Sequence, residues 1–160
     1  MSRSHVRLGK PQSEAELGAV KALFEEYASS LNFSLAFQDF AKEMATFPGK
    51  YAPPDGALLL ATVDGEPAGA VALRQLAPGI CEMKRLFVKP QFRELALGRQ
   101  LAEAIVAEGR AMGYRAMRLD TIRSSMAKAR ALYERMGFRE VEPYYDNPMP
   151  DACYMELQLQ

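Results

Sequence analysis

The sequence contains no tryptophan, one histidine and two cysteines. A single histidine, His5 near the N-terminus, argues against a histidine-based catalytic triad, and we expect no metal centre. The cysteines, Cys81 and Cys153, lie far apart and in no motif that would make either a nucleophile. We therefore expect both thiols to be reduced and buried, without a disulfide between them.

Long apolar runs are also missing. The longest, at about 57–63, is far shorter than the ~20 residues that cross a bilayer. The first residues carry no apolar stretch of the kind found in secretory signals. These absences exclude a membrane-spanning helix and lead us to expect a cytoplasmic protein without a membrane partner.

The net charge is zero, with 20 basic and 20 acidic residues, but the charges are unevenly distributed. The segment from Lys84 to Arg139 contains 13 basic and 5 acidic residues. An excess of positive charge on one segment indicates either an anionic partner or helix surfaces made soluble by basic residues. Because the basic residues are spread singly, a phosphate-bearing small molecule is favoured over a nucleic acid.

The N-terminal part predicts two helices. Ser13 and Glu16 have the spacing of a capping box, in which the serine side chain accepts a hydrogen bond at a helix start. Apolar residues follow at helical spacing over 17–31, and a shorter stripe runs over 37–47. The segment 47–56 is rich in proline and glycine and is expected to form a loop.

The rest of the chain alternates strands and helices. Three antiparallel strands are expected at 57–63, 68–76 and 80–88, joined by the turn sequences Asp64-Gly65 and Pro78-Gly79. A helix is expected over 97–112, followed by Gly113, and then a strand at 115–121. The next helix is expected to be capped by Ser124 or Ser125 and to end at Gly137. The last two strands are expected at 138–145 and 152–159. With 160 residues, the chain is expected to form one α+β domain over 1–160.

The junction between the strand at 80–88 and the following helix is the first candidate site. Backbone N–H groups at a helix start have no partner within the helix, and the helix dipole favours negative charge there. Arg93 and Arg99 flank this junction, so it can bind a phosphate. The alternative is an ordinary loop with solvated arginines.

Two motifs in this half of the chain resemble the GNAT superfamily of acyl-CoA-dependent N-acetyltransferases. Arg93-Glu-Leu-Ala-Leu-Gly98 is similar to the family's Arg/Gln-x-x-Gly-x-Gly/Ala. Ala129-Arg-Ala-Leu-Tyr-Glu-Arg-Met-Gly-Phe138 is similar to its Ala-x-x-Leu-Tyr-x-x-x-Gly-Phe. Both motifs occur in the family's order and on the expected elements, and the resemblance extends from about residue 57 to the C-terminus.

The sequence departs from the family pattern at three positions. Ala96 replaces a glycine, which we expect to be tolerated only if this residue has a negative φ. Glu94 carries a negative charge close to the expected pyrophosphate. Met126 occupies the position of an asparagine that contacts the cofactor in many relatives. These differences bear on the affinity for the cofactor rather than on the fold.

The resemblance implies a mixed sheet of about six to seven strands, with helices on both faces and a splay between the strands at 80–88 and 115–121. Acetyl-CoA, as co-substrate, would enter this splay from one side and an amine from the other. The residues implied to bind acetyl-CoA are Leu86, Phe87 and Val88 beside the pantetheine arm, Arg93, Glu94, Leu95, Ala96, Leu97, Gly98 and Arg99 at the pyrophosphate, and Met126 and Arg130.

Two residues are candidates for the chemistry of transfer. Glu82 is the expected base that takes a proton from the amine, with Asp120 as the second choice; the alternative is a strand glutamate at the surface. Tyr133 is the expected acid that protonates the leaving thiolate, and the alternative is a core tyrosine bonded to a backbone carbonyl. The residues expected to contact the acceptor are Phe33, Tyr51, Asp120 and Tyr145, although aromatic residues in these regions also serve as core.

The predicted function is transfer of an acetyl group from acetyl-CoA to a primary amine of a small molecule or amino-acid-like acceptor, by direct attack in a ternary complex. The main alternative is a catalytically silent acyl-CoA-binding regulator with the same fold. A binding module for nucleic acid or protein is supported only by the charge asymmetry. We expect no nucleic-acid partner, and relatives often form homodimers.

Overall fold

The computed structural model describes residues 5–31, 34–35, 39–124 and 126–160. These residues form one seven-stranded mixed sheet with the strand order β1-β2-β3-β4-β5-β7-β6. The strands are β1 (Val6–Gly9), β2 (Ala57–Val63), β3 (Glu66–Ala77), β4 (Ile80–Val88), β5 (Ala116–Ile122), β6 (Arg139–Val141) and β7 (Ala152–Gln158). The helices are α1 (Glu14–Ser30), α2 (Phe40–Ala45), α3 (Leu97–Ala111) and α4 (Ala127–Met136), with short 3₁₀ turns η2 (Gly49–Tyr51) and η3 (Pro90–Leu95).

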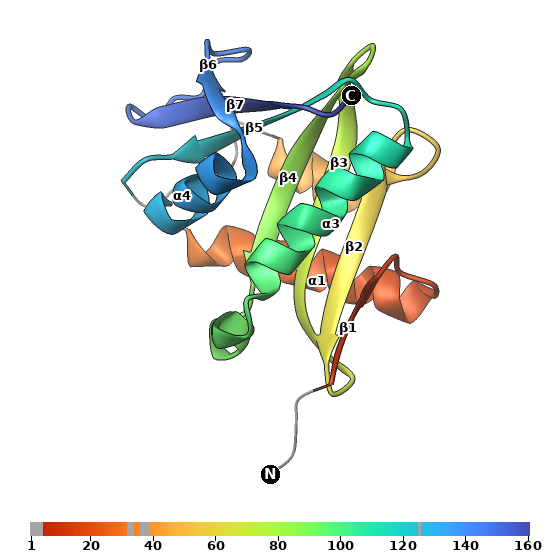
Figure 1. Cartoon of the computed structure of the whole chain (residues 1–160). Coiled ribbons are helices and arrows are strands. Elements are labelled where there is room, and N and C mark those ends of the chain that lie inside the picture. The colour runs from red at the N-terminus through yellow and green to blue at the C-terminus, as the bar shows by residue number, and fades with distance from the viewer. Residues whose placement is uncertain (1–4, 32–33, 36–38, 125) are drawn as a thin grey trace.

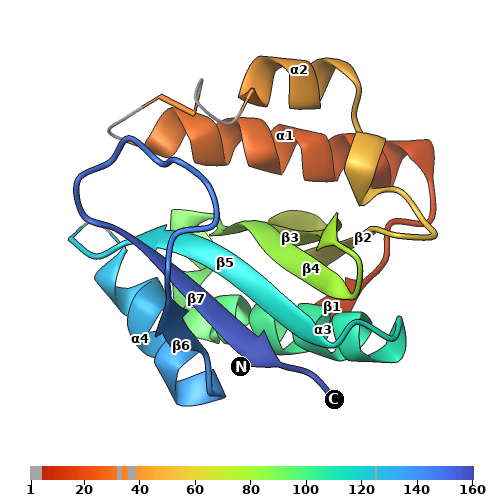
Figure 2. The same ribbon diagram turned by 90° about the horizontal axis from the view of Figure 1, so that it is seen from above.

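Helices cover both faces of the sheet, as expected. α3 crosses the face of the sheet that is turned toward the viewer in Figure 1, and α1 lies behind it. Seen from above, α1 and α2 lie on one side and α3 and α4 on the other (Figure 2). The loop between β6 and β7 rises past the sheet toward the α1 side (Figure 2). That loop therefore reaches the face opposite to α4, which precedes it in the chain.

Two apolar cores hold these layers together. The larger core lies between the sheet and α3 and α4, and includes Leu101, Ile105 and Met117. The smaller core lies on the α1 side and includes Phe24, Leu58 and Phe87. Within the described residues, no helix combines the length and the apolar character needed to cross a membrane.

The start of α1 confirms the capping box, since the Ser13 Oγ accepts a hydrogen bond of 3.1 Å from the Glu16 N–H. The predicted cap of α4 is wrong. α4 begins after Met126, without a capping hydrogen bond from a side chain, and the Ser124 hydroxyl instead bonds Asp151. Gly137 ends α4 with a φ of 104°, as expected.

Two strand predictions also differ from the structure. The strand expected at 138–145 is limited to β6, because the chain turns away after Val141 into the loop that leads to β7. No element was predicted for Val6–Gly9, and they form the edge strand β1 against β2. Their alternation of half-buried and exposed residues is too short to give a clear periodic pattern.

A β-bulge changes the direction of the side chains in β4. Ala70 pairs with Phe87 and Ala72 pairs with Lys84, so two residues of β4 lie opposite one residue of β3. Arg85, within this bulge, has a φ of 61°. An extra residue shifts the alternation of faces. As a result Lys84 and Arg85, although consecutive, both lie next to residues of the α2 region.

The expected splay is present. β4 and β5 run parallel and pair through three residue pairs, at Ile80–Ala116, Cys81–Met117 and Glu82–Arg118. Beyond these pairs the two strands diverge, although both continue, to Val88 and Ile122. The facing edges of the diverging segments are therefore left for a ligand to pair with.

Candidate functional site

A cavity of about 140 Å³ occupies the splay between β4 and β5. Its walls come from both diverging strands, from α4 and from the end of α1. We call it the splay cavity. The residues that line it and matter below are Lys84 and Leu86 on β4, Asp120 on β5, and Met126, Ala129 and Tyr133 beside and on α4.

A second cavity, of about 420 Å³, lies on the α2 side of the sheet. We call it the α2 cavity. Its volume is within the ~300–1,000 Å³ typical of small-molecule sites. It is lined by α2, by the turn that follows α2, and by β3, β4 and the β6–β7 loop, including Glu43, Tyr51, Arg74, Lys84 and Tyr145.

Lys84 lines both cavities and so marks the place where they approach each other. Its side chain extends from β4 just before the bulge, and the residue is 8% exposed. Burial lowers the pKa of the Lys84 ammonium, while the nearby carboxylates of Glu82 and Asp120 act in the opposite direction. A ligand that spans the two cavities would pass this side chain.

Glu82, the predicted base, is fully buried on β4. Its Oε1 accepts a hydrogen bond of 2.8 Å from the Arg74 Nε, and its Oε2 accepts one of 2.6 Å from the Tyr144 hydroxyl. The Arg74 guanidinium lines the α2 cavity, whereas Glu82 lies behind it and lines neither cavity. Tyr144 also lines neither cavity, so a proton from a ligand would reach Glu82 through water.

Asp120, the second candidate, lines the splay cavity directly. Its Oδ2 accepts hydrogen bonds from the Tyr145 hydroxyl and, at 2.9 Å, from the Asn147 side chain. Tyr145 lines the α2 cavity, so the Asp120–Tyr145 pair connects the two cavities. The consecutive tyrosines of the β6–β7 loop thus each donate to one carboxylate, Tyr144 to the buried Glu82 and Tyr145 to the half-buried Asp120.

Tyr133 lies on α4 and its ring packs against Phe138, with centroids 5.7 Å apart. The residue is 6% exposed and lines the splay cavity. Within the part of the chain that the structure describes, its hydroxyl group has no hydrogen-bond partner. Burial raises the pKa of this hydroxyl, so it remains protonated through neutral and mildly alkaline pH.

The junction before α3, where phosphate binding was predicted, contains η3, which was not expected. The Arg93 Nε bonds the Val88 carbonyl at 3.1 Å. The first backbone bond of α3 runs from the Gln100 N–H to the Ala96 carbonyl, at 3.2 Å. The N–H groups of Leu97, Gly98 and Arg99 therefore open the helix without an acceptor within it.

The expectation for Ala96 is wrong, because its φ is 57°. The chain turns from η3 into α3 at this residue, and a left-handed residue makes the turn. A non-glycine residue in this conformation costs roughly 1–2 kcal/mol. Gly98 has room, since an added Cβ would lie 4.0 Å from the nearest atom, in Val88.

A model of the acetyltransferase (GNAT) family matches residues 20–138 of this sequence. The chain is also 37% identical over 161 residues to an uncharacterised N-acetyltransferase of Schizosaccharomyces pombe, covering 99% of this chain and 98% of that protein. The chain belongs to the acetyltransferase (GNAT) family. Members of this family use acetyl-CoA as co-substrate.

Solved structures of GNAT acetyltransferases share the fold. One from Staphylococcus aureus Mu50 superposes with a TM-score of 0.78 at 16% identity, over 98% of this chain and 100% of that one. An acetyltransferase from Salmonella typhimurium, solved with its cofactor acetyl-CoA, has a TM-score of 0.70 at 16% identity, over 97% and 94% of the two chains.

The other predicted residues of this GNAT chain lie in different surroundings. Leu86 and Met126 line the splay cavity, and Tyr51 lines the α2 cavity. Arg130 pairs with Glu134 and Glu140, so its side chain is held beside β6. Phe87 and Val88 are buried in the two cores, and Arg99 pairs with Glu103 on the helix surface. Phe33 lies outside the described residues.

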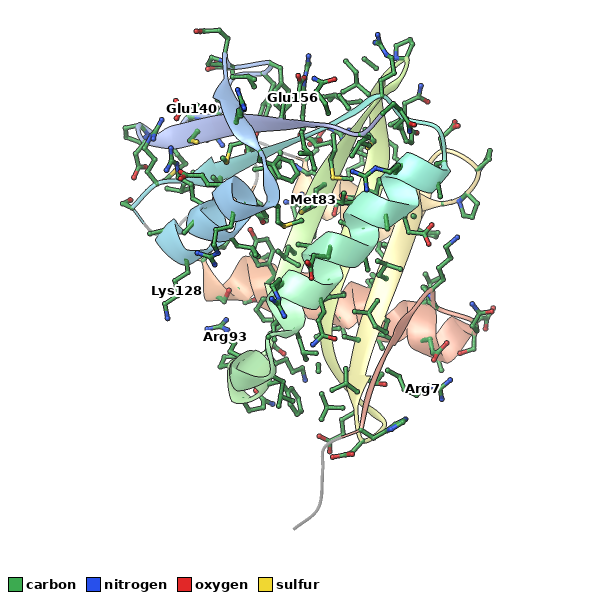
Figure 3. All side chains as sticks on the ribbon, viewed as in Figure 1. Arg7, Met83, Arg93, Lys128, Glu140 and Glu156 are labelled. Carbon is green, nitrogen blue, oxygen red and sulfur yellow. The ribbon has the colours of Figure 1, made fainter. Side chains whose placement is uncertain are left out.

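Figure 3 places two of the basic side chains. Arg93, from η3, and Lys128, from α4, both project outward near the end of the molecule at which α3 begins (Figure 3). Met83 lies in the interior on β4. The outward direction of Arg93 is compatible with a charged ligand at the start of α3.

Sequence reasoning missed Arg74, Lys84 and Glu43. The signal for Lys84 was available: β4 reads Ile-Cys-Glu-Met-Lys-Arg-Leu-Phe-Val, with three charged residues inside a strand buried on both faces. Charges in such a position are expected to be paired or functional. Arg74 becomes a site residue only through its register opposite Glu82, which the sequence does not reveal.

Proposed function

We propose that this GNAT protein transfers the acetyl group of acetyl-CoA to a primary amine of a small, amino-acid-like molecule, by direct attack in a ternary complex. The observation that carries the proposal is the pair of cavities that approach each other at Lys84, one in the splay and one on the α2 side. Two ligands on opposite sides of β4 can then react without a covalent enzyme intermediate.

The residues present fit acetyl-CoA. The diverging edges of β4 and β5 offer backbone groups to an extended chain that contains amides. The N–H groups of Leu97, Gly98 and Arg99 open α3 without an intrahelical acceptor, which favours a pyrophosphate there. When bound, acetyl-CoA supplies an acetyl thioester that an uncharged amine can attack.

The amine must first lose a proton, because an alkylammonium has a pKa near ~10. We assign this proton to Glu82, with water as the carrier, because neither Glu82 nor Tyr144, whose hydroxyl donates to the Glu82 Oε2 at 2.6 Å, lines either cavity.

Asp120 is the second candidate, favoured by a separate observation. It lines the splay cavity and bonds Tyr145, which lines the α2 cavity. Replacing each carboxylate in turn separates the two. If Glu82 is the base, Glu82→Gln lowers kcat/KM by about 10²-fold or more across pH 6–9, and Asp120→Asn has the smaller effect. The reverse order would move the role to Asp120.

The leaving thiolate takes its proton from Tyr133. The conjugate thiol has a pKa near ~8.5, lower than that of the buried Tyr133 hydroxyl. The hydroxyl therefore stays protonated until negative charge develops on the sulfur beside it. Its position on the wall of the splay cavity supports this role.

The position of the co-substrate is tested at Gly98. Since an added side chain has space within the protein there, Gly98→Val is expected to fold and to obstruct the ligand. The KM for acetyl-CoA should rise by tenfold or more, with little change in the KM for the amine. Gly18→Val, at an exposed position of α1 with nothing within 4 Å, is the control. An unchanged KM for acetyl-CoA would place the ligand elsewhere.

The proposal as a whole is tested by measuring CoA thiol release with acetyl-CoA and a panel of amines. Steady turnover with at least one amine is expected. Tight binding of acetyl-CoA without turnover on any amine would instead indicate the catalytically silent regulator.

A further inference from the structure

The α2 cavity has a distinctive charge distribution. Four cations line it at increasing depth: Lys42 and Lys50 are exposed, Arg74 is half-buried and Lys84 is buried. Among the described residues of its wall, the acids are Asp39, which is exposed, and Glu43. Positive charge thus extends from the solvent to the inner wall.

The acids that balance the inner cations lie outside this cavity or are already engaged. Glu82 binds Arg74 at 2.8 Å but does not line the cavity. Glu43 lines it, but its two oxygens bind Arg85 at 3.1 and 2.8 Å. The inner wall therefore consists of the guanidinium of Arg74 and the side chain of Lys84, with the Glu82 carboxylate behind them.

An acceptor with only an ammonium group would meet this wall unfavourably, since like charges repel and the Glu43 and Glu82 carboxylates are bonded to arginines. A carboxylate on the acceptor would reverse the interaction, because hydrogen bonds between ionised partners are the strongest available. The guanidinium of Arg74 suits a carboxylate in particular, since it keeps further donors beyond those that bind Glu82.

Building on the proposed function, we propose that the acceptor carries a carboxylate next to its amine, as an α-amino acid does, and that Arg74 and Lys84 bind this carboxylate. The short separation between the amine and the carboxylate is inferred from the position of Lys84, which lines both cavities. A carboxylate held there leaves the amine only a bond or two away, beside the splay where the acetyl group arrives. The remainder of the acceptor occupies the α2 cavity near Tyr51.

The wild-type protein tests this without any substitution. The kcat/KM of leucine is compared with those of leucinamide and 3-methylbutylamine, which share its side chain but lack the carboxylate. Phenylalanine and glutamate are each compared with their amide and their decarboxylated amine in the same way, which gives three such trios. Charge-assisted hydrogen bonds of this kind correspond to a preference of tenfold or more in kcat/KM for the acid. An α-amino group in an amide has a lower pKa, near ~8, and so is more reactive at neutral pH. A preference for the acid would therefore run against intrinsic reactivity.

The failures are distinguishable. Equal or better turnover of the amide or the simple amine overturns the carboxylate preference and leaves acetyl transfer intact. No CoA thiol release with any member of the trios overturns the proposed function together with this inference.

Substitutions then locate the preference. In Lys84→Met and Arg74→Gln, the ratio of kcat/KM for acid over amide should fall toward one, while the KM for acetyl-CoA stays within about twofold. Arg7→Gln is the control, because Arg7 is exposed on the edge strand β1 and lines neither cavity (Figure 3). Arg74→Lys keeps a cation beside Glu82 and serves if the glutamine variant does not fold. An unchanged ratio in both Arg74→Gln and Lys84→Met would show that these residues do not bind the carboxylate.

Discussion

Three tyrosines surround the place where the two cavities approach each other, and their hydroxyl groups have different partners. Those of Tyr144 and Tyr145 donate to Glu82 and Asp120. That of Tyr133 has no partner among the described residues and lines the splay cavity. The Tyr133 hydroxyl therefore can bond a ligand that enters the splay.

This difference gives a prediction for Tyr133→Phe. The substitution keeps the ring against Phe138 and removes a hydroxyl that makes no hydrogen bond with the protein. Turnover should fall by about 10²-fold, because the leaving sulfur loses its proton donor, while Tm should stay the same or rise slightly. The measurements are kcat at saturating acetyl-CoA and a thermal melt of the ligand-free protein.

Tyr114→Phe is the matched control. The Tyr114 hydroxyl donates to the Asp55 carbonyl at 2.6 Å, so its removal should cost about 1 kcal/mol of stability and leave kcat unchanged. If Tyr133→Phe behaved as this control does, with normal turnover and a lower Tm, Tyr133 would be a structural tyrosine.

At the scale of elements, the join between η3 and α3 depends on the left-handed conformation of Ala96. This residue has a φ of 57°, where glycine has no steric penalty. Ala96→Gly should raise the stability by about 1 kcal/mol, or Tm by roughly 2–4 °C. Ala107→Gly, at an exposed position in the middle of the same helix, should lower it by a similar amount. A loss of stability in Ala96→Gly would mean that the turn carries no strain.

Elements that are defined by local sequence could be predicted, whereas those that depend on a partner strand could not. The bounds of β4 were correct because a buried strand between Gly79 and Pro90 is defined by local sequence. α1 was found through its capping box, which is also local. β6 was overextended, and β1 was missed, because a short edge strand is fixed by its partner rather than by its own pattern. The bulge in β4 depends on register with β3, which no local signal encodes.

The same contrast between local signals and contacts between elements applies to the candidate site. The helix start near Gly98 and the tyrosine on α4 followed from motifs that lie within single elements, and the splay was implied by the family that these motifs resemble. Arg74 and Lys84 were missed because their importance arises from contacts between β3, β4 and the α2 region. The β6–β7 loop was suspected of contacting the substrate, but the pairing of its tyrosines with Glu82 and Asp120 required the fold.

At the scale of the whole molecule, the sheet has two parts joined through the three residue pairs between β4 and β5. β1 to β4 form one part, and β5, β7 and β6 form the other. Beyond the three pairs, the inner edges of both parts are open to the splay cavity. A ligand that pairs with both edges would complete the sheet, so binding and stability should be coupled.

Hydrogen exchange with and without acetyl-CoA tests this coupling. The segments 83–88 and 119–122 pair with β3 and β7 on their outer edges. In the ligand-free protein, the amides of these segments that point into the splay should exchange faster than those of β2 and β3, because that edge has no partner strand. Acetyl-CoA at 100 times its Kd stabilises the protein by about 2.7 kcal/mol, which corresponds to up to ~100-fold slower exchange where opening releases the ligand. Protection should appear on both walls of the splay and at 97–99, and should be small in β1. Gly98→Val, with an affinity at least tenfold weaker, should show protection that is lower by tenfold or more at the same ligand concentration. Protection of one wall alone would show that the ligand does not bridge β4 and β5, and the two parts of the sheet would then be stable independently of acetyl-CoA.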